Sequence, residues 1–260
     1  MALSASVPLV DVVILTWNDG GLLDVAVASA LESEGVDVRV WVVDNGSDPP
    51  AMVADDSRVA LVRNAANRGV ARGRNQGAAA GDAPLVCFLD SDARLHPATL
   101  RSLADELASD HVGLAAPVIT SMSPRSSAGR APSLARKVAR ALNLTSVYAG
   151  TPHPRDAVSW PVEFAIGACQ LVRRTAFEGV GGLDESYFYG PEDVDLCLRI
   201  RAAGWRIVQV AAARCDHPAR RRFRKVLTVR GFQHGLAVLR HLWRHRGHRS
   251  SSRAWEPSTS

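Results

Sequence analysis

Two carboxylates spaced one residue apart, Asp90 and Asp92, follow the apolar run Leu85–Leu89. Negative charges this close are costly to hold together unless a cation or strong hydrogen-bond donors compensate them. Oxygen ligands suit Mn²⁺ or Mg²⁺ ions that also bridge to phosphate oxygens. An Asp-x-Asp pair is common on protein surfaces but rarer directly after a buried strand. The spacing therefore indicates a site for a divalent cation and a phosphorylated ligand.

A second acidic pair, Glu192 and Asp193, follows the aromatic stretch Tyr187–Tyr189. Both residues would lie in the first turn of a helix, where the helix dipole stabilises carboxylates. Acidic first turns are common for this reason alone. The functional alternative is that one of the pair is a general base, which takes a proton from an incoming hydroxyl. The aromatic side chains would then hold the face of a sugar.

Asp44 ends a further apolar run, and the glycine-rich stretch 67–77 follows it. A carboxylate at a strand end can accept the ring N–H of a pyrimidine, although Asp is equally typical of turns and helix caps. The stretch 67–77 would let the backbone approach a ligand and would present helix N–H groups to an anion. Arg72 and Arg74 would hold a diphosphate there, or else be solvated side chains beside a tightly packed helix.

A single histidine, His217, follows the last predicted strand. A lone histidine is usually a surface or capping residue. As a metal ligand it would have to reach the cation held by Asp90 and Asp92.

The elements that must position these side chains alternate between strands and helices. In the first half, apolar runs at 10–15, 38–43, 59–62 and 85–89 alternate with helical patterns at 22–32 and 69–80. This alternation favours βαβ units and a parallel sheet, which binds ligands at the carboxyl ends of its strands. Later patterns predict helices at 97–109 (with Pro97 at the first helical position), 192–203 and 218–245, and strands at 112–119 and 205–211.

The composition is that of an ordinary globular protein of 260 residues, with 47% hydrophobic and 22% charged side chains. Its apolar runs are far shorter than the roughly 20 residues of a membrane-spanning helix, and no signal peptide is recognised. Four cysteines are scattered without CxxC spacing, mostly in apolar stretches. This pattern predicts free, buried thiols in a reduced cytoplasmic protein.

The positive charge is concentrated at the C-terminus. Residues 218–260 contain 11 Lys and Arg residues and one acid, Glu256, so the remainder of the chain is mildly acidic. This distribution argues against nucleic acid as a partner. Residues 218–246 have an amphipathic basic pattern, which predicts either packing on the domain or peripheral contact with an anionic membrane.

Taken in order over residues 10–217, these segments resemble the family-two glycosyltransferases with the GT-A fold. They are most similar to the rhamnosyltransferase-like bacterial branch, which builds cell-wall or surface glycans. The matching segments are Val12–Asn18, Val42–Ser47, Asn67–Gly77, Leu89–Asp92, Gly167–Arg174, Gly181–Glu185, Glu192–Leu196, Gly204–Arg206 and His217.

The resemblance implies an α/β fold of GT-A type, with a Rossmann-like, mostly parallel sheet flanked by helices. It implies a catalytic domain over residues 1–217, with a nucleotide-binding half at about 8–118 and an acceptor half at about 119–217. Residues 218–260 would form a basic helical extension, disordered after about 247.

The resemblance also implies roles for individual residues. Asp193 would be the catalytic base, with Glu192 placed to hold hydroxyls of either substrate. Asp92, Asp90 and His217 would hold the Mn²⁺ or Mg²⁺ cofactor. The donor would be bound by Thr16, Asn18, Asp44, Arg74, Asn75, Asp90, Ser91, Gly167 and Ala168.

The implied reaction moves a sugar from a dTDP- or UDP-sugar to a glycan, a lipid-linked acceptor or a small-molecule hydroxyl. A single displacement would invert the anomeric configuration, with Arg74 and the cation stabilising the leaving group. One alternative is an inactive relative that only binds nucleotide sugars, whose mark would be loss of these carboxylates. A sugar nucleotidyltransferase would need a basic loop after its first strand, but no Lys or Arg precedes Arg39.

Overall fold

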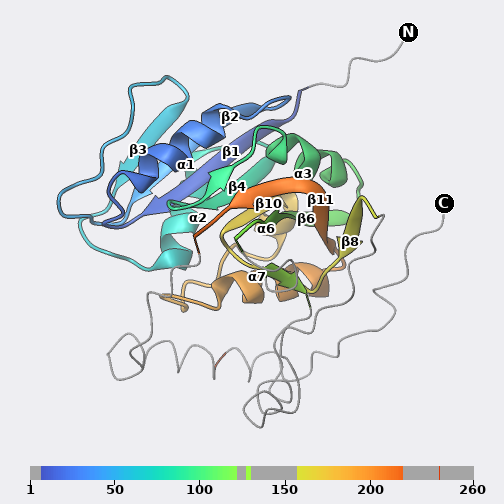
Figure 1. Ribbon diagram of the computed structural model, residues 1–260. Helices are drawn as coiled ribbons and strands as arrows, with labels where there is room; N and C mark the ends of the chain where they lie inside the picture. The colour runs from blue at the N-terminus through green and yellow to red at the C-terminus, as the bar shows by residue number, and fades with distance from the viewer. Residues whose placement is uncertain (1–6, 122–126, 130–156, 219–239, 241–260) are drawn as a thin grey trace.

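The computed structural model describes residues 7–121, 127–129, 157–218 and 240 (Figure 1). Within them, one nine-stranded sheet runs through the molecule in the order β3-β2-β1-β4-β10-β6-β11-β5, with β8 pairing with β11. The strands of this sheet, in chain order, are β1 (Leu9–Thr16), β2 (Asp37–Asp44), β3 (Val59–Arg63), β4 (Leu85–Asp90), β5 (Arg94–Leu95), β6 (Val112–Ile119), β8 (Ser159–Pro161), β10 (Cys169–Arg173) and β11 (Arg206–Asp216).

The sheet is mostly parallel, as the sequence predicts. Strands β3, β2, β1 and β4 are parallel neighbours, and β6 pairs in parallel with β11. Strand β10 lies between β4 and β6 and is antiparallel to both. A separate small sheet pairs β7 (Ala128–Gly129) with β9 (Phe164–Ala165). Strands β5 and β8 are antiparallel to β11. The predicted α/β architecture is therefore confirmed, with antiparallel strands that the sequence pattern did not reveal.

Helices cover both faces of the sheet, and each face has its own hydrophobic core. Helices α1 (Leu22–Leu31) and α3 (Thr99–Leu107) pack in one core cluster. Helices α2 (Val70–Ala80), α6 (Arg174–Gly179) and α7 (Glu192–Ala202) pack in the other. Because alternate strand residues point to opposite faces, the continuous apolar runs of β1 and β4 are buried on both sides.

Helix α2 lies unusually close to the sheet. A Cβ atom at Gly73 would overlap the side chain of Leu15, and one at Gly77 would overlap Val13. The glycines of this stretch therefore allow close helix–strand packing. Its first residues consequently lie directly beside the carboxyl ends of β1 and β4.

Two predicted boundaries were wrong. Helix α3 begins at Thr99, because Pro97 lies in a preceding turn in which the N–H of Thr99 donates to the carbonyl of His96. The last strand was expected to end at Ala211 but continues to Asp216, with a register shift between Val210 and Arg214.

The four cysteines are free and buried, as expected. No helix among the described residues combines the length and hydropathy needed to cross a membrane. Apart from Arg240, the predicted basic helix beyond Pro218, its membrane contact and the disorder after about 247 fall outside the described residues, so these stay predictions. The large sheet contains strands from both predicted halves of the domain.

Candidate functional site

Asp90, Asp92 and His217 form a cluster at the carboxyl end of β4. Nε2 of His217 lies 3.1 Å from Oδ1 of Asp92 and 3.4 Å from Oδ2 of Asp90. One potential ligand atom from each of the three residues lies within 4.8 Å of the others. The extended end of β11 explains the arrangement, because Asp216 pairs with Arg94 just after the Asp-x-Asp turn. That pairing brings His217 back to the two carboxylates.

The chemistry of this cluster fits a divalent cation. Burial alone would lower the pKa of His217, but the carboxylates of Asp90 and Asp92 outweigh it and raise the pKa to about 10. A divalent cation would supply the positive charge that the carboxylates require in place of this proton, because His217 can bind a metal only as a neutral imidazole. Its Nδ1 atom is buried and makes no hydrogen bond to any described residue. Two carboxylates and one imidazole suit Mn²⁺ somewhat better than Mg²⁺, which prefers oxygen ligands throughout.

Arg74, in α2, forms an ion pair with Asp90. Its side chain is only 3% exposed. Nη2 donates to Oδ1 of Asp90 at 2.5 Å and to the carbonyl oxygen of Gly167 at 2.7 Å. The guanidinium also lies over the ring of Phe88, 5.8 Å from its centroid. A buried guanidinium with these partners orients the metal-site carboxylate, so Arg74 acts here as a positioning residue. Direct contact with a donor stays a prediction.

Gly167 connects Arg74 to Asp193. Its carbonyl accepts from Arg74, while its N–H donates to Oδ2 of Asp193 at 2.8 Å. A Cβ atom on Gly167 would lie 2.6 Å from Nη1 of Arg74 and 3.2 Å from Cβ of Asp193. The adjacent Ala168 is buried, and its carbonyl accepts the N–H of Asp90. Whether Gly167 and Ala168 also contact a sugar stays a prediction.

Asp193 and Glu192 begin α7 and face the same site. Burial raises the pKa of Asp193, and the charge of Asp90 adds to the rise. Burial, followed by the charge of Asp193, raises the pKa of Glu192 to about 7. Oε2 of Glu192 is buried and has no hydrogen-bond partner among the described residues. A continuous series of contacts therefore joins the Asp90–Asp92–His217 cluster to Asp193 at the start of α7. It runs from Asp90 through Arg74 and Gly167.

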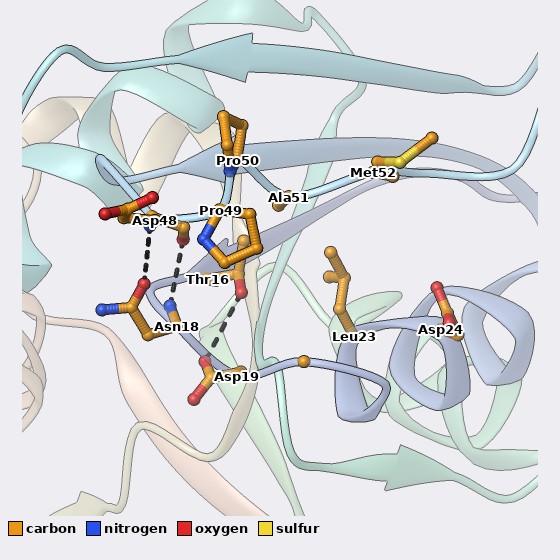
Figure 2. A pocket seen from close by; sticks show the side chains of 12 residues that line it. Thr16, Asn18, Asp19, Leu23, Asp24, Asp48, Pro49, Pro50, Ala51 and Met52 are labelled. Carbon is orange, nitrogen blue, oxygen red and sulfur yellow. Dashed lines mark hydrogen bonds between the residues drawn. The ribbon is translucent and has the colours of Figure 1, made fainter.

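A pocket of about 360 Å³ opens beside this cluster, between the loops that follow β1 and β2 (Figure 2). Thr16 and Asn18 line it, together with Leu23, Pro49 and Met52 among others, and their contact with a donor stays a prediction. Asn18 joins the two loops, because its N–H donates to Oγ of Ser47 and its Oδ1 accepts the N–H of Asp48.

Asp19 lines this pocket and is a residue that sequence reasoning missed. Its Oδ2 accepts hydrogen bonds from Oγ of Ser91 and, at 3.5 Å, from Oγ1 of Thr16. It thereby ties the pocket to the Asp-x-Asp turn. The signal was present in the sequence, since Asp19 follows the first strand just as Asp44 ends the second.

Two other residues predicted to bind the sugar donor, Asp44 and Asn75, form hydrogen bonds with the backbone of nearby loops. Asp44 is 2% exposed, and its oxygens accept the N–H groups of Ser47 and Ala51 at 2.9 Å. Burial would raise the pKa of Asp44, but these hydrogen bonds outweigh it and lower the pKa. The side chain of Asn75 pairs with the N–H and carbonyl of Leu183, each at 2.9 Å. Contact of either residue with a donor stays a prediction.

Two groups at the start of α2 that the sequence suggested for an anion have partners within the protein. The N–H of Val70 donates to the carbonyl of Phe188 at 2.8 Å. Arg72 pairs with Glu185 at 2.8 Å. The segment before α7 thus occupies groups that the sequence suggested for a diphosphate.

Comparison with known proteins gives consistent matches. Residues 11–181 match the family described as glycosyl transferase family 2. The chain is 33% identical over 230 residues to N-acetylglucosaminyl-diphospho-decaprenol L-rhamnosyltransferase of Mycobacterium tuberculosis, covering 79% of this chain and 75% of that one. It is 33% identical over 206 residues to pre-mycofactocin glycosyltransferase of the same species, covering 77% of this chain but 42% of the relative.

Among solved structures, the mannosyltransferase PcManGT of Pyrobaculum calidifontis, in complex with GDP-Man and Mn²⁺, superposes with a TM-score of 0.64. The match covers 94% of this chain and 66% of that chain at 18% identity. At this identity the likeness shows the GT-A fold alone.

Proposed function

The chain belongs to glycosyl transferase family 2, in its rhamnosyltransferase-like branch, and we propose that it is a metal-dependent, inverting enzyme that uses a nucleotide-diphosphate sugar. The observation that carries the proposal is the chain of contacts from the Asp90–Asp92–His217 cluster through Arg74 and Gly167 to Asp193. A donor diphosphate and a general base would meet across it. The presence of the whole set favours an enzyme over a relative that only binds nucleotide sugars.

Asp90, Asp92 and His217 would hold Mn²⁺ or Mg²⁺, which would offset the negative charge of the diphosphate leaving group. Arg74 keeps Asp90 in place through a direct ion pair, so the carboxylate need not reorganise when a ligand arrives.

Asp193 would take the proton from the acceptor hydroxyl. Its raised pKa makes it a stronger base than an exposed aspartate, and a base works best when its pKa approaches the operating pH. The N–H groups of Gly167 and Val194 each hold one of its oxygens at 2.8 Å. The oxygen of the acceptor would attack the anomeric carbon opposite the diphosphate, inverting its configuration. Glu192 would bind a neighbouring hydroxyl.

The pocket beside the cluster suits the nucleoside end of the donor. Three carboxylates line it (Asp19, Asp24 and Asp48), and no Lys, Arg or His among the described residues does. Such a lining disfavours phosphate but accepts hydrogen bonds from ribose hydroxyls and base N–H groups. Pro49 and Leu23 would contact the flat base. The diphosphate would then extend toward Asp90 and Asp92.

The proposal also extends to the identity of the acceptor and of the donor nucleotide. The name of the mycobacterial relative supports a sugar on a lipid diphosphate as acceptor and rhamnose as the transferred sugar. This would place the reaction in cell-wall glycan synthesis, with dTDP-rhamnose as the first donor to test and UDP-sugars as the next.

The test is a screen of the purified chain, with Mn²⁺, against dTDP-, UDP- and GDP-sugars, read as release of nucleoside diphosphate. We expect hydrolysis of at least one dTDP- or UDP-sugar, abolished by EDTA and restored by Mn²⁺. The product formed with an accepted glycan should carry the inverted linkage by NMR. Absence of hydrolysis and of calorimetric binding for every donor would contradict the proposal.

A further inference from the structure

Two large aromatic side chains are exposed beside the candidate active site. In the segment that connects α6 to α7, Tyr187 is buried, whereas Phe188 is 42% exposed and Tyr189 is 48% exposed. They lie immediately before Gly190, Pro191 and the acidic pair that begins α7. Exposed aromatic residues next to a polar site commonly mark a ligand-binding surface.

Contacts with α2 hold this segment in place. The carbonyl of Phe188 accepts the N–H of Val70, and a Cβ atom on Gly69 would lie 2.8 Å from that carbonyl oxygen. Gly69 also has a φ of +89°, which disfavours any other residue there. Further along α2, Asn75 pairs with both backbone groups of Leu183. The two rings are therefore exposed on a braced backbone.

Tyr189 lies near the acidic groups of the site, close enough for their charges to affect its pKa. Burial raises the pKa of Tyr189 to about 12, and the charges of Asp90, Glu192 and Asp193 contribute to the rise. Tyr189 is therefore both 48% exposed to solvent and near these carboxylates.

From this arrangement we propose that Phe188 and Tyr189 form the platform on which the pyranose ring of the acceptor stacks. The apolar C–H face of a sugar packs on aromatic rings, while its hydroxyls bind nearby carboxylates. The proposed base Asp193 must lie within hydrogen-bond reach of the acceptor hydroxyl, and this aromatic segment leads directly into it. The lining of the nucleoside pocket does not include Phe188 or Tyr189. This inference rests on the proposed function and names the substrate part that the segment binds.

The test compares wild type with Phe188→Ala, Tyr189→Ala and Phe188→Trp, using methyl and octyl glycosides of glucose, N-acetylglucosamine, galactose and mannose. Transfer kinetics give KM for the glycoside, and saturation-transfer NMR gives binding. We expect each alanine variant to raise KM about tenfold, equivalent to about 1.4 kcal/mol, for methyl and octyl glycosides alike. Phe188→Trp should retain binding. In Phe188→Ala, donor hydrolysis without acceptor should change much less than KM for the glycoside, because Phe188 does not line the nucleoside pocket.

Val25→Ala is the matched control, because Val25 is 48% exposed on α1, away from this segment, and its loss should leave KM unchanged. Thermal unfolding checks that the variants fold. An unchanged KM in both alanine variants would overturn the platform. So would an effect confined to octyl glycosides, or to binding of phosphatidylglycerol vesicles, since the rings would then contact lipid chains. Failure of wild type to bind any pyranoside while it hydrolyses donor would also overturn it. Failure of donor hydrolysis itself would count against the proposed function instead.

Discussion

The amide N–H of Gly167 donates to Oδ2 of Asp193 at 2.8 Å, so one glycine holds the carboxylate proposed as catalytic base. Its carbonyl simultaneously accepts from Arg74, the partner of Asp90. The position tolerates no side chain without displacing one of these groups. This relationship makes Gly167 a sensitive test of whether the two ends of the site work together.

Gly167→Ala should lower kcat/KM for transfer by about 100-fold, because a 1 Å misplacement of a reacting group can have that effect. The new Cβ atom would lie 2.6 Å from Nη1 of Arg74 and would push it or Asp193 aside. Gly179→Ala is the control, since a Cβ atom there meets nothing within 4 Å. Equal kinetics for the two variants would show that the Gly167 contacts are not needed.

Asp193→Asn should reduce kcat by roughly 100- to 10,000-fold, the usual contribution of a general base. The amide cannot take a proton, although its oxygen can still accept the N–H of Gly167. Donor affinity, measured by calorimetry with the nucleoside diphosphate and Mn²⁺, should change little. Asp110→Asn, in an exposed turn after α3, serves as control. Transfer at near-wild-type rates would remove Asp193 from the role of base.

The pH dependence of kcat/KM should report the coupled pair Glu192 and Asp193. Burial raises the pKa of both carboxyls, that of Glu192 to about 7, so activity should fall as the pH drops and Asp193 becomes protonated, at a higher pH than for an exposed aspartate. Glu192→Gln removes one negative charge beside Asp193 and should move the acidic limb of the profile to lower pH. A limb that stays in place in this variant would mean that another group controls the profile.

Asp92→Asn should weaken binding of Mn²⁺, titrated calorimetrically in the presence of dTDP or UDP, by at least about tenfold, since one of three protein ligands loses its charge. Treatment of wild type with EDTA should abolish transfer, and added Mn²⁺ should restore it. Asp105→Asn, an exposed carboxylate on α3 paired with Arg101, should bind Mn²⁺ as wild type does. Full activity in EDTA would contradict the metal site.

Asp11→Ala should destabilise the protein by about 3 kcal/mol or more, as removal of one partner from a buried ion pair does. Asp11 is fully buried and accepts from Arg39, Trp41, Arg174 and the N–H of Ala83. Urea denaturation measures the loss.

The control for this variant is Asp82→Ala. Asp82 also pairs with Arg39, but its side chain is 89% exposed. Exposed pairs contribute about 1 kcal/mol or less. If the two variants lost stability equally, the buried position of Asp11 would not be the cause.

Sequence periodicity predicted the elements whose pattern is long and local. Strands β1, β2 and β4 and helices α1, α2 and α7 lie close to the expected boundaries. Ligands bind at the carboxyl ends of parallel strands, and this rule correctly pointed to the end of β4, where Asp90 and Asp92 lie. Their meeting with Asp193 followed from family resemblance, because no local pattern relates positions a hundred residues apart.

The sequence did not predict which residues pair with the buried charged side chains. Arg74 looked like a ligand-binding arginine, but its partners are Asp90, 16 residues away, and Gly167, 93 residues away. Asp11 looked like an interruption of a strand and is a buried, fully paired carboxylate. Strand β10 is a short segment whose apolar residues are interrupted by the buried Gln170, and it was not predicted as a strand. Each of these depends on long-range pairing that periodicity does not record.

The antiparallel strand β10 also limits how the enzyme can move. Strands β4 and β6 belong to the first half of the chain, yet the only strand between them is contributed by residues 169–173. A fragment ending at residue 118 would leave one edge of β4 open and β6 without either of its neighbours, and open strand edges are templates for aggregation. Nor can the halves swing about a hinge, since that would break the ladders on both sides of β10. Any closing movement around a substrate would therefore have to involve segments outside the sheet.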